Sequence, residues 1–225
     1  MSSNQTRCYR CVGDIQKMIK YEKTKSASQR YICITCGKTR VRNYVYRAYR
    51  NDTNQKIIQL IKQGLGIRST ARILKISAPT LLKRIISIAR NIAKPISSRG
   101  KTYEVDELCT YIGHKKNYIW LVYALEKNSR TVVSFNVGKR TNKTLNRVLE
   151  TLKLSGAKKI FTDRLKNYRY LLDEKLHSVK RFGTNHIERK NLTLRTHLKR
   201  LNRRTICFSK SLVVFTAVLK IYFWI

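Results

Sequence analysis

The order of apolar patterns from residue 102 onward limits the fold of this chain more than any other feature. Residues 103–112, 118–125 and 131–137 are rich in β-branched and aromatic side chains, and turn-like residues separate them. Strand patterns joined by short turns predict an antiparallel meander. Helical spacing then appears in residues 141–154, where Leu145, Val148, Leu149 and Leu152 recur on one face.

The pattern after this helix alternates between short strands and helices. Residues 159–162 predict a buried strand, 165–176 a helix and 178–179 a brief strand. A last strong helix follows, in which apolar residues and one asparagine step by threes and fours: Ile187, Asn191, Leu194, Leu198 and Leu201. The whole order is β-β-β-α-β-α-β-α. This is the order of a ribonuclease-H-like α/β domain, which we place at residues 101–225.

Residues 51–95 predict a small helical domain, followed by a linker that contains proline, serine and glycine. A helix over 54–63 ends at two glycines, and a second helix spans 69–74. Ser77 can cap a third helix, with Pro79 in its first turn. This order predicts a helix-turn-helix unit whose last helix enters the major groove of DNA, although a helical hairpin with a packing role is the alternative. The candidate DNA contacts are Thr80, Lys83 and Arg84.

Residues 1–50 contain four of the six cysteines, arranged as two Cys-x-x-Cys pairs. Each pair can present two thiolates to one ion, and two pairs complete the tetrahedral site of a zinc ribbon. The spacer between them is slightly longer than usual, and unrelated cysteines or a redox pair are the alternatives. Four protein ligands leave no open position, so the expected role of Zn²⁺ is structural. The ligands are Cys8, Cys11, Cys33 and Cys36.

The charge of the chain indicates a polyanionic partner. Lys and Arg number 49 against 12 Asp and Glu, which gives a formal net charge of +37. Neutralisation of phosphates by such side chains dominates nucleic-acid affinity, so double-stranded DNA is the expected partner. An RNA-binding or anionic-membrane-binding protein is the alternative. The first residues are polar and lack the apolar stretch of a signal peptide, so we expect a cytoplasmic, nucleoid-associated protein.

Three carboxylates fall on elements that the predicted sheet brings together. Asp106 lies in its first strand, Asp163 follows its fourth strand, and Glu188 lies in the first turns of the last helix. Convergent carboxylates bind hard cations such as Mg²⁺. Each acid taken singly could be an unrelated surface group, but three acids at these elements in such an acid-poor chain favour a site.

Two further acids compete for this role. Glu104 shares a strand face with Asp106 and is an alternative or fourth ligand. Glu107 points to the opposite face of the strand, so we expect it to matter less.

The motifs that contain these residues resemble those of the transposase of the insertion sequence 1 family. The resemblance covers nearly the whole chain. The run 104–107 resembles the first catalytic motif, Thr162-Asp163 with Tyr168 the second, and residues 186–195 the third. Residues 201–205 and 208–211 complete the signature, and the cysteine pairs with the helix-turn-helix resemble the DNA-binding half of the family.

The resemblance implies a DDE transposase with the catalytic triad Asp106, Asp163 and Glu188. In that reading the triad holds two Mg²⁺ ions, and Asp106 bridges them. The enzyme binds the terminal inverted repeats of an insertion sequence, cuts a strand there and joins the freed 3′-hydroxyl to target DNA. Both element ends must be held together, so a homodimer or larger assembly is expected. The alternative is a non-catalytic DNA-binding regulator of the element, or an inactive copy.

Many basic residues surround the third motif. Their simplest role is that of a solvated basic helix, but beside three acids we expect them to hold DNA strands. The candidates are Arg189, Lys190, Arg195, Lys199, Arg203 and Arg204.

Overall fold

The computed structural model describes residues 8, 10–11, 18–25, 27–41, 48, 50–96, 98–202 and 204–225. The chain divides into two compact units, Met1–Arg47 and Ala48–Ile225. Each unit is described by itself.

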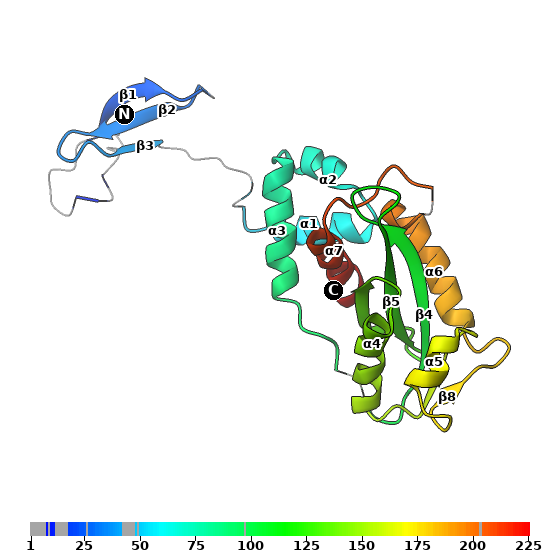
Figure 1. The fold of residues 1–225 in the computed structure, drawn as a ribbon. Coiled ribbons are helices and arrows are strands. Elements are labelled where there is room, and N and C mark those ends of the chain that lie inside the picture. The colour runs from blue at the N-terminus through cyan, green and yellow to red at the C-terminus, as the bar shows by residue number, and fades with distance from the viewer. Residues whose placement is uncertain are drawn as a thin grey trace. The chain divides into compact units, whose positions relative to one another are not determined.

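The first unit contains a small antiparallel sheet (Figure 1). Its strands are β1 (Met18–Lys23), β2 (Gln29–Cys33) and β3 (Thr39–Val41), in the order β1-β2-β3. The turn after β2 needs Gly37, whose φ of 68° lies in the left-handed region that favours glycine. Apart from Cys8 and Cys33, the described residues of this sheet are exposed or half-buried. Among its described residues, this unit therefore buries little apolar surface.

The second unit begins with three helices, α1 (Thr53–Lys62), α2 (Ile67–Leu74) and α3 (Ala78–Arg90). The side chain of Ser77 accepts a hydrogen bond from the Thr80 amide, and proline stands in the first turn of α3. These features confirm the predicted helix-turn-helix and its cap.

A mixed sheet of five strands follows, in the order β6-β5-β4-β7-β8. The strands β4 (Thr102–Tyr111), β5 (Tyr118–Glu126) and β6 (Val132–Gly138) form an antiparallel meander. The short strands β7 (Lys159–Phe161) and β8 (His177–Ser178) run parallel to β4. The first strand therefore lies beside the fourth, and the predicted ribonuclease-H-like order is confirmed.

Helices cover both faces of this sheet (Figure 1). One face packs against α4 (Asn142–Leu154) and α5 (Lys166–Leu171). The other packs against α6 (Asn185–His197), the 3₁₀ turn η2 (Lys199–Leu201) and α7 (Leu212–Trp224). The helix α5 is shorter than the sequence predicts, because Leu172 already has extended backbone angles.

The helix α7 also belongs to a second core. Ala217, Val218 and Ile221 are buried in one apolar cluster with residues of α1, α2 and α3. The helix-turn-helix and the sheet domain are therefore joined through α7. Among the described residues, no helix has the length and apolar character needed to cross a membrane.

Candidate active site

The strand β4 carries the acidic run at the point where its neighbour ends. Strand β7 pairs only with residues 102–104 of β4 and stops at Phe161. On that side the next residues of β4, Asp106 among them, have no strand beside them. Side chains from both faces of β4 can therefore reach the open edge, and Asp163 arrives there two residues after β7 ends.

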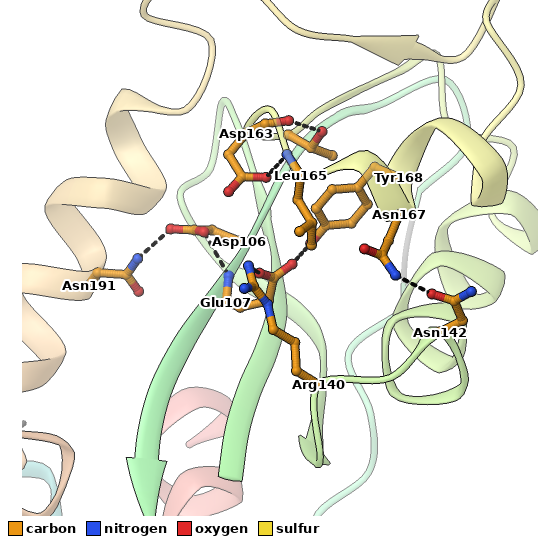
Figure 2. Close-up of polar contacts among 10 residues, drawn as sticks. Asp106, Glu107, Arg140, Asn142, Asp163, Leu165, Asn167, Tyr168 and Asn191 are labelled. Carbon is orange, nitrogen blue, oxygen red and sulfur yellow. Dashed lines mark hydrogen bonds and ion pairs between the residues drawn. The ribbon is translucent and has the colours of Figure 1, made fainter. Parts of the chain in front are cut away.

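Three carboxylates meet at this edge (Figure 2). Asp106, Glu107 and Asp163 each offer an oxygen, and these oxygens all lie within 4.8 Å of one another. We call these three residues the carboxylate cluster. Asp163 is exposed and Asp106 is half-buried, whereas the side chain of Glu107 is buried. The structure thus brings together two of the three predicted catalytic acids, Asp106 and Asp163.

Asp163 is held by the chain that follows it. Its Oδ1 accepts a hydrogen bond from the Leu165 amide at 3.0 Å, immediately before α5 begins. This local bond fixes the side chain while leaving it open to solvent.

Glu107 is the residue whose place the sequence did not reveal. It lies on the opposite face of β4, as strand alternation requires, and accepts hydrogen bonds from the Tyr168 hydroxyl and from Arg140 at 3.0 Å. Its side chain is only 2% exposed. Its carboxylate nevertheless reaches the cluster, because the edge beside β4 is open. The sequence signal was its position next to Asp106, but the early end of β7 could not be read from the pattern.

The environment of Asp106 disfavours its charged form. Burial raises the pKa of Asp106 to about 6, and the charges of Glu107 and Asp163 act in the same direction. Hydrogen bonds from the Glu107 amide at 2.7 Å and from Asn191 Nδ2 at 2.7 Å act in the opposite direction.

Glu188 lies in the first turn of α6, as predicted, but its carboxylate is not part of the cluster. It is exposed, and its Oε1 accepts a hydrogen bond from the Thr184 hydroxyl at 2.7 Å. The residue of α6 that contacts Asp106 is Asn191.

Glu104, the alternative ligand, has both oxygens occupied by protein groups. Its carboxylate is fully buried and accepts hydrogen bonds from the Ile187 amide and from His186 Nδ1, each at 2.8 Å. Lys127 Nζ lies 3.7 Å away. Glu104 therefore shares the face of Asp106 but binds the start of α6.

The four predicted zinc ligands also lie together. The sulfur atoms of Cys8, Cys11, Cys33 and Cys36 all lie within 4.8 Å of one another, and all four are free cysteines. Backbone N–H groups, first that of Cys36, lower the pKa of Cys33 to about 6, and those of Arg10 and Cys11 lower the pKa of Cys8. Hydrogen bonding with Cys36 and burial raise the pKa of Cys11 to about 12. A pKa this high disfavours the thiolate of Cys11 when no cation lies beside it.

The predicted DNA contacts differ in their freedom to bind. Arg84 donates a hydrogen bond to the Ala48 carbonyl at 2.6 Å, and the Thr80 hydroxyl lies 2.8 Å from that of Ser77. Lys190 and Arg195 are half-buried, and burial lowers the pKa of Lys190. Arg203 lies outside the described residues. The exposed candidates are Lys83, Arg189, Lys199 and Arg204.

Comparison with known protein families gives two matches. Residues 101–225, more than half of the chain, match the family model described as IS1 transposase. Residues 44–89 match the model described as InsA C-terminal domain.

Individual proteins give a consistent result. The chain is 40% identical over 119 residues to the insertion element IS1 protein InsB of Shigella flexneri. The aligned residues cover 53% of this chain and 91% of that protein. It is 41% identical over 108 residues to the IS1 2 protein InsB of Escherichia coli K12, covering 48% of this chain and 65% of that protein.

Similar solved structures include the HTLV-2 integrase catalytic core domain in complex with magnesium, with 18% identity, a TM-score of 0.35 and coverage of 56% of this chain and 84% of that one. A simian T-cell lymphotropic virus intasome matches with 15% identity, a TM-score of 0.39 and coverage of 73% and 65%. These structural similarities are too low to support an argument. The family match stands without them, and the chain belongs to the IS1 transposase family.

Proposed function

We propose that this DNA transposase cuts and joins strands at the ends of an insertion sequence, and that Asp106, Asp163 and Glu188 are its catalytic carboxylates. The observation that carries the proposal is the convergence of Asp106 and Asp163 at an open sheet edge. A protein that only bound and regulated the element would not need this arrangement, so the regulator is the less favoured reading.

The carboxylate cluster fits a hard divalent cation. Three carboxylates share a small volume, and the ion pair that the described residues form with them is that of Arg140 with Glu107. Oxygen ligands of this kind suit Mg²⁺. When bound, divalent cations activate the attacking oxygen and stabilise the leaving oxygen of a phosphodiester, for which a pair of ions is the expected arrangement.

The protein's own residues supply position and charge. The Leu165 amide and Asn191 orient Asp163 and Asp106, and the exposure of Asp163 lets a DNA backbone approach. Glu188 lies in the first turn of the helix that also carries Asn191, one turn away on the same side, so it is placed to approach the cluster when DNA and cations bind. Exposed Arg189 beside it can neutralise a strand phosphate.

The N-terminal unit and α3 would recognise the element. Four sulfurs at these distances, in a unit with little apolar core, fit one structural Zn²⁺. The capped helix α3 presents Lys83 to solvent and is the candidate for the major groove. Both ends of an element must be held at once, so we propose that the protein acts on DNA as a homodimer or larger assembly in the nucleoid.

The test is cleavage of a duplex that carries the terminal repeat, with Mg²⁺ or Mn²⁺. Asp163→Asn and Glu188→Gln keep the side-chain shape and remove one charge each. Each is expected to abolish cleavage and strand transfer, at least about 100-fold, and to leave binding of end DNA intact. The matched control is Glu150→Gln, an exposed acid of α4 whose partner is Asn146. A parent protein that bound the ends and never cut them would establish the regulator instead.

A further inference from the structure

Helix α6 contacts Asp106 through one half-buried polar side chain. Asn191 lies in the apolar stripe formed by Ile187, Leu194 and Leu198, where a fourth apolar residue would continue the core. Its Nδ2 instead donates a hydrogen bond to Asp106 Oδ2 at 2.7 Å (Figure 2). A polar group at such a position needs partners, because burying it unpaired is costly.

The second partner of Asn191 is Tyr123. This tyrosine is directly opposite Asp106 in the register of β4 and β5, and it is fully buried. Its hydroxyl lies 2.8 Å from Asn191 Oδ1 and 3.2 Å from the carbonyl oxygen of Ile187. Burial holds the pKa of the Tyr123 hydroxyl well above its usual value, so the group remains a donor.

These two contacts permit one orientation of the Asn191 amide. With Oδ1 toward Tyr123 and Nδ2 toward Asp106, each donor faces an acceptor. The reversed amide would place its oxygen against the Asp106 carboxylate, which has no hydrogen to donate when ionised. The Asp106 carboxylate therefore determines which atom of Asn191 faces it, and the Tyr123 hydroxyl supplies a donor for the Asn191 Oδ1 on the other side.

The start of α6 is also fixed along its axis. Glu104 accepts hydrogen bonds from the Ile187 amide and from His186, and it is fully buried. Asn191 follows one turn later, so the helix cannot slide without breaking these bonds. The distance between Asn191 and Asp106 is thereby set by the same strand that carries Asp106.

We infer that Tyr123 and Asn191 are positioning residues of this transposase: the Tyr123 hydroxyl holds the oxygen of the Asn191 amide in place, and the amide nitrogen holds the Asp106 carboxylate in the orientation that places it in the cluster with Asp163. The inference rests on the proposed role of Asp106 as a cation ligand. In this inference both residues act through Asp106.

Two variants test the inference. Tyr123→Phe removes only the hydroxyl, and Asn191→Leu continues the apolar stripe while removing the amide. Binding of Mn²⁺ to the full chain is measured from the electron paramagnetic resonance signal of free Mn²⁺. The Mg²⁺ concentration that gives half-maximal cleavage of a terminal-repeat duplex is measured beside it. Both variants are expected to bind Mn²⁺ about 10-fold or more weakly, as is common when a group that orients a metal ligand is lost.

Thermal unfolding separates positioning from a structural role. Asn191→Leu should keep or raise the melting temperature while it lowers Mn²⁺ affinity, because an apolar side chain suits the stripe and Tyr123 retains the Ile187 carbonyl as acceptor. The matched control is Tyr111→Phe. Tyr111, in β4, is buried like Tyr123. Its hydroxyl donates to the Thr205 carbonyl, away from the cluster. This control should bind Mn²⁺ like the parent.

The outcomes distinguish this inference from the proposed function. If Tyr123→Phe and Asn191→Leu both bind Mn²⁺ like the parent and need no more Mg²⁺, the positioning role is wrong, whatever their melting temperatures. The proposed cation site is wrong if the parent binds no Mn²⁺, or if Asp163→Asn leaves all of its Mn²⁺ binding intact. The inference then fails with it.

Discussion

At the scale of single residues, Asp106 is held in a setting that costs stability without a cation. Burial and two neighbouring carboxylates raise its pKa to about 6, against an unfolded value of about 3.9. The folded protein therefore binds this proton more tightly than the unfolded chain does. The resulting stabilisation is fully present below about pH 4 and is lost as the pH rises through about 6.

Asp106→Asn should remove this loss of stability at neutral pH, because asparagine does not ionise. In buffer free of Mg²⁺ and Mn²⁺, we expect the variant to be more stable than the parent at pH 7.5, by about 1–2 kcal/mol after allowing for one weakened hydrogen bond. The difference should vanish near pH 4. Urea unfolding followed by tryptophan fluorescence measures it, since Trp120 and Trp224 both lie in the second unit. Added Mn²⁺ should stabilise only the parent. A variant less stable than the parent at pH 7.5 would contradict this reading of the site.

Glu107→Gln tests whether the third carboxylate of the cluster matters. The substitution removes one negative charge from the cluster and leaves Arg140 in place, so the local charge becomes less favourable for a cation. We expect weaker Mn²⁺ binding, by about 10-fold, and slower cleavage. Titration with Mn²⁺ measures the first effect directly, with Glu150→Gln as control. Unchanged Mn²⁺ binding would leave Glu107 as only an anchor for Tyr168 and Arg140.

The residues of the site divide into those that sequence patterns could predict and those they could not. Asp106 lies within the first strand of the sheet and Asp163 follows the end of the fourth, and strand order can be predicted from apolar periodicity. Asn191 gave a signal as the polar member of an apolar stripe, but its partner Tyr123 lies far away in the sequence. Such pairings depend on register and helix position, which periodicity does not determine.

At the scale of elements, the N-terminal unit differs from the rest of the chain in what holds it together. Its three short strands bury little apolar surface, so the cysteine cluster must supply much of the stability. Backbone N–H groups of Cys36 and Thr35, in the turn before Gly37, lower the pKa of Cys33 and so favour its thiolate. Metal binding and folding are expected to be coupled in this unit.

Cys33→Ser tests this coupling between metal binding and folding. We expect the full chain to lose its bound zinc, one ion per chain in the parent, and residues 18–41 to become sensitive to limited proteolysis. The second unit should keep its tryptophan fluorescence, and binding of end DNA should weaken. Cys109→Ser is the control, since this cysteine lies in β4 outside the cluster. A zinc-free Cys33→Ser protein with an intact, protease-resistant first unit would show that the metal is dispensable there.

At the scale of the whole molecule, the helix-turn-helix and the sheet domain were expected from the sequence as separate domains joined by a linker. The linker is present between α3 and β4, yet α7 returns from the C-terminus to pack in both cores. Phe215 and Leu219 of α7 contact the sheet side, whereas Ala217, Val218 and Ile221 lie with the helices. Nothing in the linker's composition indicates this return, because it depends on which face of a nearly all-apolar helix meets which partner.

Ile221→Ala tests whether α7 makes one cooperative unit of residues 48–225. Ile221 is fully buried against the helix-turn-helix, so its truncation leaves a cavity and should cost about 2–4 kcal/mol. We expect hydrogen exchange to show that α1, α3 and the strands β4 and β5 lose protection together, and that binding of end DNA weakens although no DNA-facing residue is changed. The control is Leu154→Ala, at the exposed last residue of α4, and it should change little. Loss of protection confined to α1–α3, with the sheet as stable as in the parent, would instead show two independently folding domains that merely share a helix.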